Sequence, residues 1–263
     1  RMQRILLICL VATLAACGHP HRERHGDAPA PARVTEANFR DSDPHPWADP
    51  SPYRYPVHGI DLSKFQTSVD WAEARDNGVN FAFIKATEGG DQADPMFEDH
   101  WRGARRAGVA VGAYHFYYHC RPAIEQARWF IEHVPRTPGA LPPVLDMEWT
   151  PTSPTCRIRR DPETIKSEAR IFLNAVEAHY GQRPIIYTTV DFYRDNAMST
   201  MAGTEFWLRS VAANPKDVYA GQTWKIWQYT STGIVPGIAG NVDVNVFNGS
   251  KAEWEAWLAR RSQ

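Results

Sequence analysis

Short apolar runs alternate with longer amphipathic segments from residue 57 onward, and this rhythm restricts the chain to few folds. The runs that predict strands are 57–62, 81–86, 109–116, 143–148 and 184–188. Apolar residues recur at helical spacing between them, in one case after Asp161-Pro162, a typical helix start. Apolar strands that alternate with helices favour a parallel sheet covered by helices. Five such repeats in succession indicate an α/β fold, a TIM-like barrel.

The rhythm changes after the fifth repeat. Strands are expected at 206–211, 224–229 and 242–247, but segments rich in glycine, proline and serine separate them and show no helical period. A last amphipathic helix is expected at 251–261. The sequence therefore predicts one barrel domain over residues 57–263 with eight strands, with helices between strands only among the first five and a closing helix at the end.

The start of the chain is typical of an export signal. Arg1 and Arg4 precede an apolar run, residues 5–16, that is too short to span a bilayer, which predicts a signal peptide over residues 1–16. Leu14-Ala15-Ala16-Cys17 resembles the lipobox of bacterial lipoproteins, where the cysteine is lipidated. An ordinary signal peptide with a chance cysteine is the alternative. We therefore expect an exported protein, lipid-anchored through Cys17 in the cell envelope of a bacterium, at the outer membrane or in the periplasm.

Residues 17–56 are predicted to form a flexible linker after the lipidated cysteine. Eight prolines lie between Gly18 and Pro56, with few large apolar residues, so the segment offers little surface to bury. The composition gives no reason to expect other partners. The formal net charge of −1 provides no attraction for nucleic acid, and a monomer is the default expectation.

Cys120 and Cys156 are the cysteines that remain in the predicted domain, and a disulfide between them is expected in an oxidising compartment. No second cysteine or histidine stands at ligand spacing beside either one, so no metal site is expected. The sequence also contains no glycine-rich phosphate loop and no Ser-His-Asp motif, and it predicts no cofactor.

Carboxylates stand at the ends of several predicted strands, where active sites lie in such barrels. Asp146 and Glu148 are two residues apart, so both side chains point to the same face of a strand. Like charges this close raise at least one pKa, and a general acid needs a raised carboxyl pKa. Asp61 and Asp243 are expected at the same mouth. Without such neighbours, a solvated or arginine-paired couple would be the simpler interpretation of Asp146 and Glu148.

Aromatic and polar side chains near the same strand ends predict a sugar-binding site. The predicted substrate-binding residues are Glu88, Tyr114, His115, Tyr187, Trp227 and Gln228. Aromatic rings stack on pyranose faces, and their polar tips donate hydrogen bonds. Tyr229 is a further candidate. For each aromatic residue taken singly, packing in the core is the alternative role.

Six blocks occur in an order and spacing that together mark one family. The blocks are His58-Gly59-Ile60-Asp61-Leu62-Ser63, Phe83-Ile84-Lys85-Ala86-Thr87-Glu88-Gly89, Gly112-Ala113-Tyr114-His115-Phe116, Leu145-Asp146-Met147-Glu148, Trp227-Gln228-Tyr229 and Gly240-Asn241-Val242-Asp243-Val244-Asn245. They resemble glycoside hydrolase family 25, the Chalaropsis-type lysozymes or N-acetylmuramidases. The resemblance runs from His58 to Asn248 and implies a barrel of the (β/α)5(β)3 kind.

The resemblance also implies an activity and roles for residues. The activity is hydrolysis of the β-1,4 bond between N-acetylmuramic acid and N-acetylglucosamine in peptidoglycan. Glu148 would protonate the leaving oxygen, and Asp146 would orient the substrate's acetamido group or stabilise positive charge. Asp61 and Asp243 match the other active-site carboxylates of the family. The sequence leaves open whether a carboxylate or the acetamide is the nucleophile.

Two departures and two alternatives accompany this interpretation. One departure lies in the predicted sixth strand, where the family usually has a small and an aromatic residue but this chain has Arg209 and Ser210, in the run Phe206-Trp207-Leu208-Arg209-Ser210. The other is the loop 150–160, which is specific to this chain. A chitinase-like or glucosaminidase-like barrel is one alternative, although such enzymes usually carry a longer acidic run before the glutamate. A non-catalytic barrel that binds cell wall is the other, although it would have no need for four carboxylates.

Overall fold

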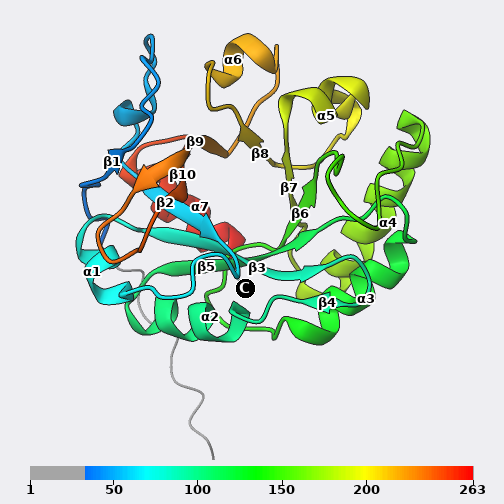
Figure 1. Ribbon diagram of the computed structural model, residues 1–263, viewed down its shortest axis with the longest axis horizontal. Helices are drawn as coiled ribbons and strands as arrows, with labels where there is room; N and C mark the ends of the chain where they lie inside the picture. Colours follow the sequence, from blue (N-terminus) through cyan, green and yellow to red (C-terminus); the bar gives the residue numbers. More distant parts are fainter. Residues whose placement is uncertain (1–32, 263) are drawn as a thin grey trace, which may run out of the picture.

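The computed structural model describes residues 33–262. The predicted signal peptide, Cys17 and the first part of the predicted linker lie outside the described residues. The described chain forms a closed barrel, as the sequence predicts (Figure 1). Its strands are β2 (His58–Leu62), β3 (Phe81–Glu88), β5 (Ala110–Phe116), β6 (Val144–Met147), β7 (Ile185–Thr188), β8 (Phe206–Arg209), β9 (Ile226–Ile234) and β10 (Val242–Phe247).

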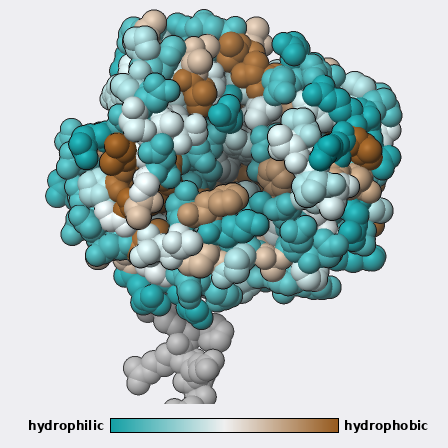
Figure 2. Space-filling model, in the orientation of Figure 1, coloured by the Kyte–Doolittle hydropathy of each residue, from teal (hydrophilic) through white to brown (hydrophobic). Residues whose placement is uncertain are grey.

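The strands follow the order β9-β10-β2-β3-β5-β6-β7-β8, and pairing of β8 with β9 closes the ring. All neighbours are parallel except β10, which runs antiparallel to both β2 and β9. The carboxyl ends of the parallel strands therefore meet at one end of the barrel, which we name the mouth. In the orientation of Figure 1, the space-filling view shows a hollow near the centre of the molecule (Figure 2).

Helices follow the first five barrel strands and cover their outer faces, which confirms the predicted change of rhythm. They are α1 (Trp71–Asp76), α2 (Phe97–Arg106), α3 (Ala123–His133), α4 (Pro162–Tyr180) and α5 (Val190–Asp195). Asp161 caps α4 by accepting from the Thr164 N–H, and Gly181 ends it at φ 74°. After β8 there is only the four-residue α6 (Pro215–Val218), and α7 (Lys251–Arg261) closes the chain. Among the described helices, none is long and apolar enough to cross a membrane.

Alternate residues of each strand build two separate hydrophobic cores. Inward side chains such as Phe83, Val144 and Trp207 fill the barrel, and Trp254 and Trp257 of α7 pack against the same cluster. Outward side chains pack under the helices. Because successive residues of a strand point to opposite faces, the position of a residue along its strand decides which core it joins.

Residues 33–56, which we name the N-terminal strap, differ from the predicted flexible linker. The sequence predicts a flexible linker as far as Pro56, but the strap is packed against the barrel (Figure 1, blue). Its short strand β1 (Arg40–Asp41) pairs antiparallel with β9, and Val34 is buried with the residues that fill the barrel. Trp47 and Tyr55 meet the outward ring of Trp227 edge-on, at centroid distances of 5.0 and 6.4 Å.

The reason for this correction lies in the barrel itself. No long helix follows β8 or β9, so the outer face of β9 lacks the helical cover that the first five strands have. The strap supplies that cover with a few aromatic rings spread among its prolines. Proline content therefore predicts extended chain correctly here but not flexibility, because extended chain can still bury side chains.

Candidate active site

The carboxylates predicted from the sequence meet at the mouth of the barrel. Asp61 lies near the end of β2, and Asp243 lies opposite it near the start of the antiparallel β10. Asp146 lies near the end of β6, next to Tyr187 of β7 in the strand register. Glu148 follows β6 and is partly exposed, while Asp61 and Asp146 are buried. The antiparallel direction of β10 explains why a residue at its start reaches the same end as residues at the ends of the other strands.

Two amide side chains hold Asp61 in place. Its Oδ2 accepts hydrogen bonds from Gln228 Nε2 at 2.8 Å and from Asn245 Nδ2 at 2.7 Å. Gln228 Oε1 accepts in turn from the Tyr187 hydroxyl at 3.0 Å. The structure thus brings the predicted residues Asp61, Tyr187 and Gln228 into one buried network.

Asn245 and Trp207 belong to the same network, although the sequence analysis did not single them out as site residues. Asn245 Oδ1 accepts from Trp207 Nε1 at 2.7 Å, and both side chains are buried. Asn245 stands two residues after Asp243 and so faces the same side of β10. That spacing was the signal that could have identified it.

Asp146 and Glu148 both have raised pKa values. Burial, and then the charge of Glu148, raise the pKa of Asp146 well above its usual value. Burial also raises the pKa of Glu148 to about 7, although the nearby cation of Arg209 opposes the rise. Within the described structure, Oδ1 of Asp146 is buried and has no hydrogen-bond partner. The pair therefore contains one carboxyl that holds a proton near neutral pH and one oxygen that is free to accept a hydrogen bond.

The other two carboxyls of the mouth are shifted in the same direction. Burial raises the pKa of Asp243 to about 6, and the charge of Arg209 opposes this rise. Burial and the charge of Asp243 raise the pKa of Asp61 well above its ordinary value, against the hydrogen bonds from Asn245 and Gln228. Four carboxyls that share one desolvated space cannot all be ionised at little cost, and strongly perturbed pKa values of this kind cluster at functional sites.

Glu88 lies at the end of β3 but is already paired within the protein. Its carboxylate binds the Lys85 ammonium and accepts a hydrogen bond from the Tyr118 hydroxyl. Burial alone would raise the pKa of Glu88, but these hydrogen bonds outweigh it and the pKa is lowered. Lys85 also lies 4.4 Å from the ring centroid of Phe116, and its charge partly offsets the rise in the pKa of Asp146. Glu88 therefore holds Lys85 beside the acidic pair.

Tyr114 is directed into the barrel near the same carboxyls. Burial, and then the charge of Asp61, raise the pKa of its hydroxyl well above the usual value, as burial also does for Tyr187. Both phenols thus stay protonated and can donate hydrogen bonds. The structure brings Tyr114 and Tyr187 to the interior below the mouth, where the sequence predicted them.

His115 and Trp227 do not lie at the mouth, and their prediction as substrate-binding residues is corrected. His115 is fully buried on the outside of β5, between Thr87 Oγ1 at 2.8 Å and Gln126 Oε1 at 3.0 Å. Trp227 is fully buried under the strap, and its Nε1 donates to the Ser210 carbonyl at 2.8 Å. Each is the chain neighbour of an inward residue, and neighbours in a strand point to opposite faces.

Tyr229 is the third outward residue of this kind. It is buried on the outer side of β9, where its hydroxyl lies 3.2 Å from His58 Nδ1. Its ring meets that of Tyr53 in the strap edge-on, at a centroid distance of 6.0 Å. The packing role that the sequence analysis kept as the alternative is therefore the one that this residue has.

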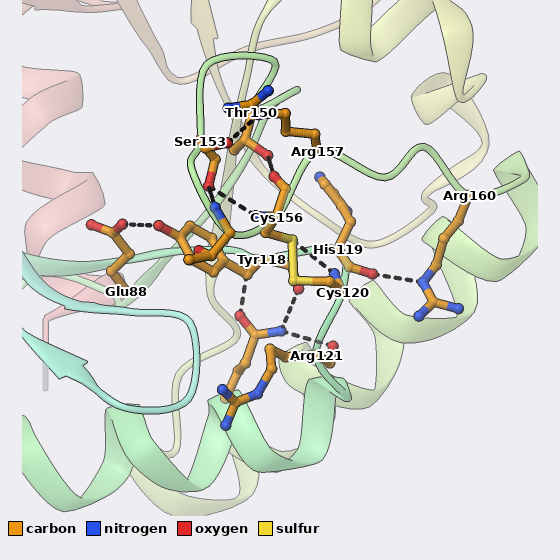
Figure 3. Close-up of a disulfide and its surroundings, with 12 residues drawn as sticks. Glu88, Tyr118, His119, Cys120, Arg121, Thr150, Ser153, Cys156, Arg157 and Arg160 are labelled. Atoms are coloured by element: carbon orange, nitrogen blue, oxygen red, sulfur yellow. Dashed lines mark hydrogen bonds between the residues drawn. A yellow bond between two sulfur atoms is a disulfide. The ribbon is translucent and has the colours of Figure 1, made fainter.

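A disulfide braces the loops beside the acidic pair (Figure 3). Cys120 follows β5 and Cys156 follows β6, and their sulfur atoms are bonded, as the sequence predicted for these two residues. Arg160 Nε donates to the His119 carbonyl at 2.6 Å, which adds a second link between the same two loops. Tyr118, which holds Glu88, lies just before this braced segment. Among residues 33–262, no three histidine, cysteine, aspartate or glutamate side chains are grouped as metal ligands.

Comparisons with known proteins agree with this geometry. The family model for "Glycosyl hydrolases family 25" matches residues 60–238. The YegX protein of Escherichia coli (strain K12) is 37% identical over 212 residues, which are 79% of this chain and 75% of YegX. Lysozyme M1 of Streptomyces globisporus is 35% identical over 213 residues, covering 74% of this chain and 69% of the lysozyme.

A solved structure extends the agreement to three dimensions. The family 25 glycosyl hydrolase of Bacillus anthracis superposes with a TM-score of 0.73 at 32% identity, over 82% of this chain and 98% of that one. Sequence and fold thus point to the same family, and the acidic mouth is where its chemistry would lie. The chain belongs to glycosyl hydrolase family 25 and is a glycoside hydrolase.

Proposed function

We propose that this enzyme hydrolyses the β-1,4 bond between N-acetylmuramic acid and N-acetylglucosamine in peptidoglycan, with Glu148 as the general acid. The observation that carries the proposal is the pKa of Glu148, which burial raises to about 7 beside a second buried carboxyl. A carboxyl that is still protonated near neutral pH can donate its proton to a glycosidic oxygen. Relatives named lysozyme and N,O-diacetylmuramidase support the choice of substrate.

In this mechanism the proton of Glu148 passes to the oxygen between the two sugars as that bond breaks. Positive charge develops at the anomeric carbon and its ring oxygen. The unpartnered Oδ1 of Asp146 accepts the N–H of the substrate's acetamido group and so orients it beside the anomeric carbon. Water then completes the hydrolysis, with the Glu148 carboxylate as the base that takes its proton.

Asp61 and Asp243 have supporting roles in this proposal. Asp61 is fixed by two amide donors to its Oδ2, so the position of its carboxyl is defined. Asp243 lies opposite Asp61 in the strand register, and Arg209 lowers the cost of its charge. Preorganised groups of this kind stabilise the charge that develops in the transition state.

Product analysis tests the proposal. Purified peptidoglycan is digested with the protein, the new reducing ends are reduced with borohydride, and the fragments are identified by mass spectrometry. A muramidase yields reduced N-acetylmuramic acid at the new ends. Reduced N-acetylglucosamine would instead identify a glucosaminidase, release of sugar from chitin oligomers a chitinase, and absence of any release a binding barrel.

We propose further that the enzyme is exported and anchored as a monomer by lipid on Cys17. The disulfide between Cys120 and Cys156 favours an oxidising compartment. The described chain begins at Arg33, whose carbonyl accepts from Arg75 near Asn80, just before the first residue of β3. Labelling with a radioactive fatty acid, expected for the wild type and absent in Cys17→Ser, tests the anchor.

A further inference from the structure

Phe65 is the most exposed large hydrophobic side chain among residues 33–262. Its exposed fraction is 79%, compared with 61% for Tyr53 and 40% for Ile171. Full burial of a phenyl ring contributes roughly 1.5–3 kcal/mol, so a fold gains nothing from a ring left in water. Phe65 also carries no polar atom that would give it another reason to face solvent.

The loop that presents Phe65 is held by hydrogen bonds on every side. The Ser63 N–H donates to Gln66 Oε1 at 3.1 Å, and the Gln66 N–H donates to the Ser63 carbonyl at 3.1 Å. The Lys64 N–H donates to Asp94 Oδ2 at 2.9 Å. Because bonds lie on both sides of Phe65 in the chain, the exposure of its ring is a property of a fixed loop and not of a loose one.

This loop belongs to the edge of the mouth. Phe65 follows Asp61 by four residues, directly after the end of β2. Gln66 Nε2 donates to the Asn241 carbonyl at 3.4 Å, and Asn241 precedes Asp243 by two residues. The loop is thus fixed to two of the strands that carry the active-site carboxyls, beyond the buried network around Asp61.

We propose that Phe65 forms a rim subsite, where its ring stacks on the apolar face of a sugar in the glycan strand outside the two sugars that flank the cleaved bond. The inference rests on the proposed function, because it takes the ligand to be a long strand of alternating amino sugars. The C–H faces of pyranoses stack on aromatic rings without any hydrogen bond. A phenyl ring at the rim therefore adds affinity for long strands and none for a disaccharide that fills only the centre.

Binding to an inactive variant tests the inference without turnover. In a Glu148→Gln background, titration calorimetry measures the affinity for long peptide-free glycan strands and for the disaccharide. Phe65→Ala should weaken strand binding about five- to tenfold, as expected for loss of one stacked ring, and leave disaccharide binding unchanged. Phe65→Trp should retain the affinity, whereas Phe65→Leu, which is apolar but not planar, should not. Ile171→Ala, on the outer face of α4, is the matched control and should change nothing.

The readouts separate the subsite from the function on which it rests. In the active enzyme, Phe65→Ala should raise KM for polymeric peptidoglycan by the same factor at nearly constant kcat, with no change in Tm because the ring is exposed. Equal strand affinity of Phe65→Ala and its parent, or an equal loss with the disaccharide, would overturn the subsite and leave the proposed function intact. A parent that binds no strand, in an enzyme that releases no sugar, would overturn both.

Discussion

The inner and outer sides of the barrel wall come from alternate residues of the same strands, yet they have opposite properties. On β9, the inward Gln228 donates to Asp61, while the outward Trp227 is fully buried beneath Trp47 of the strap. Near the mouth, inward residues are charged or amide side chains whose burial raises carboxyl pKa values. Outward residues are apolar side chains packed in the outer core, or polar ones such as His115 that are hydrogen-bonded within the protein.

The inner side of the barrel wall therefore carries the catalytic residues, and the outer side provides most of the packing that stabilises the fold. Desolvated carboxyls at the mouth cost free energy of folding, and the packed outer side offsets that cost. Substitutions on the outer side should therefore reduce stability with little change in kcat, and substitutions on the inner side should do the reverse. The following tests measure both quantities on each side.

The largest effect is expected from Trp227→Ala on the outer side. Loss of a fully buried indole should lower the free energy of unfolding by about 3–5 kcal/mol, measured by urea denaturation. In the folded fraction at low temperature, kcat should stay within about twofold of the wild type, because no atom of Trp227 faces the mouth. Trp129→Ala removes an indole from α3 that is only half-buried, so it should cost clearly less than Trp227→Ala. A large loss of kcat in Trp227→Ala would break the division between the two sides.

Glu148→Gln tests the inner side. Without its proton donor, kcat on peptidoglycan should fall by at least about 100-fold. The raised pKa means that the folded state holds a proton that the unfolded state releases between the ordinary pKa of 4.5 and about 7. Wild-type stability should therefore fall as pH rises through this window, and the variant should be more stable by up to about 3 kcal/mol near pH 8 but not near pH 4.

Glu255→Gln on the exposed side of α7 is the control for Glu148→Gln. It should leave both kcat and the pH dependence of unfolding unchanged. A Glu148→Gln protein that keeps most of its activity would exclude Glu148 as the general acid. A Glu148→Gln protein that is less stable than the wild type near pH 8 would show that desolvation does not raise the pKa of Glu148.

A smaller effect is expected from Asn245→Leu, compared with Asn196→Leu. Asn245 donates to Asp61, so its loss should lower kcat/KM about tenfold, a usual share for one hydrogen bond to a charged group. Asn196 is equally buried but lies after α5, where its amide donates to the Phe192 carbonyl. Its replacement should lower stability by about 1–3 kcal/mol and leave kcat/KM unchanged. Equal activity losses in the two variants would indicate that burial alone, and not contact with Asp61, determines the effect.

The same distinction explains what the sequence could predict. Apolar runs and helical patterns placed every barrel strand, the helices α1 to α4 and the C-terminal α7, because these patterns follow directly from which residues are buried. The short α5 was not predicted. The carboxyls were found because charge at the end of an apolar strand is costly. The errors at His115 and Trp227 arose because motif blocks include both faces of a strand. The alternation rule applied from Gln228 would have directed Trp227 outward.

The strap escaped prediction for a different reason. Its buried contacts come from a few isolated residues, such as Trp47 and Tyr55, that show no period and that only the finished barrel can cover. Long-range packing of this kind is absent from any local window of sequence. The local composition, with many prolines and few apolar residues, therefore predicted a flexible linker. It could not show that these few apolar residues fit the outer surface of the barrel.

The smallest expected effect is a shift in the pH profile, and it tests whether the inner side acts as one electrostatic unit. Activity should fall as pH rises through about 7, because Glu148 must be protonated to act as the acid. The charge of Arg209, at the end of β8, lowers the pKa of Glu148 against the effect of burial. In Arg209→Gln this alkaline limb should therefore move to higher pH, whereas Arg106→Gln on the outside of α2 should leave it in place. The full profile of kcat against pH measures the shift. If the alkaline limb stays at the same pH or moves to lower pH in Arg209→Gln, the pKa of Glu148 is determined by its own burial and not by charges across the mouth.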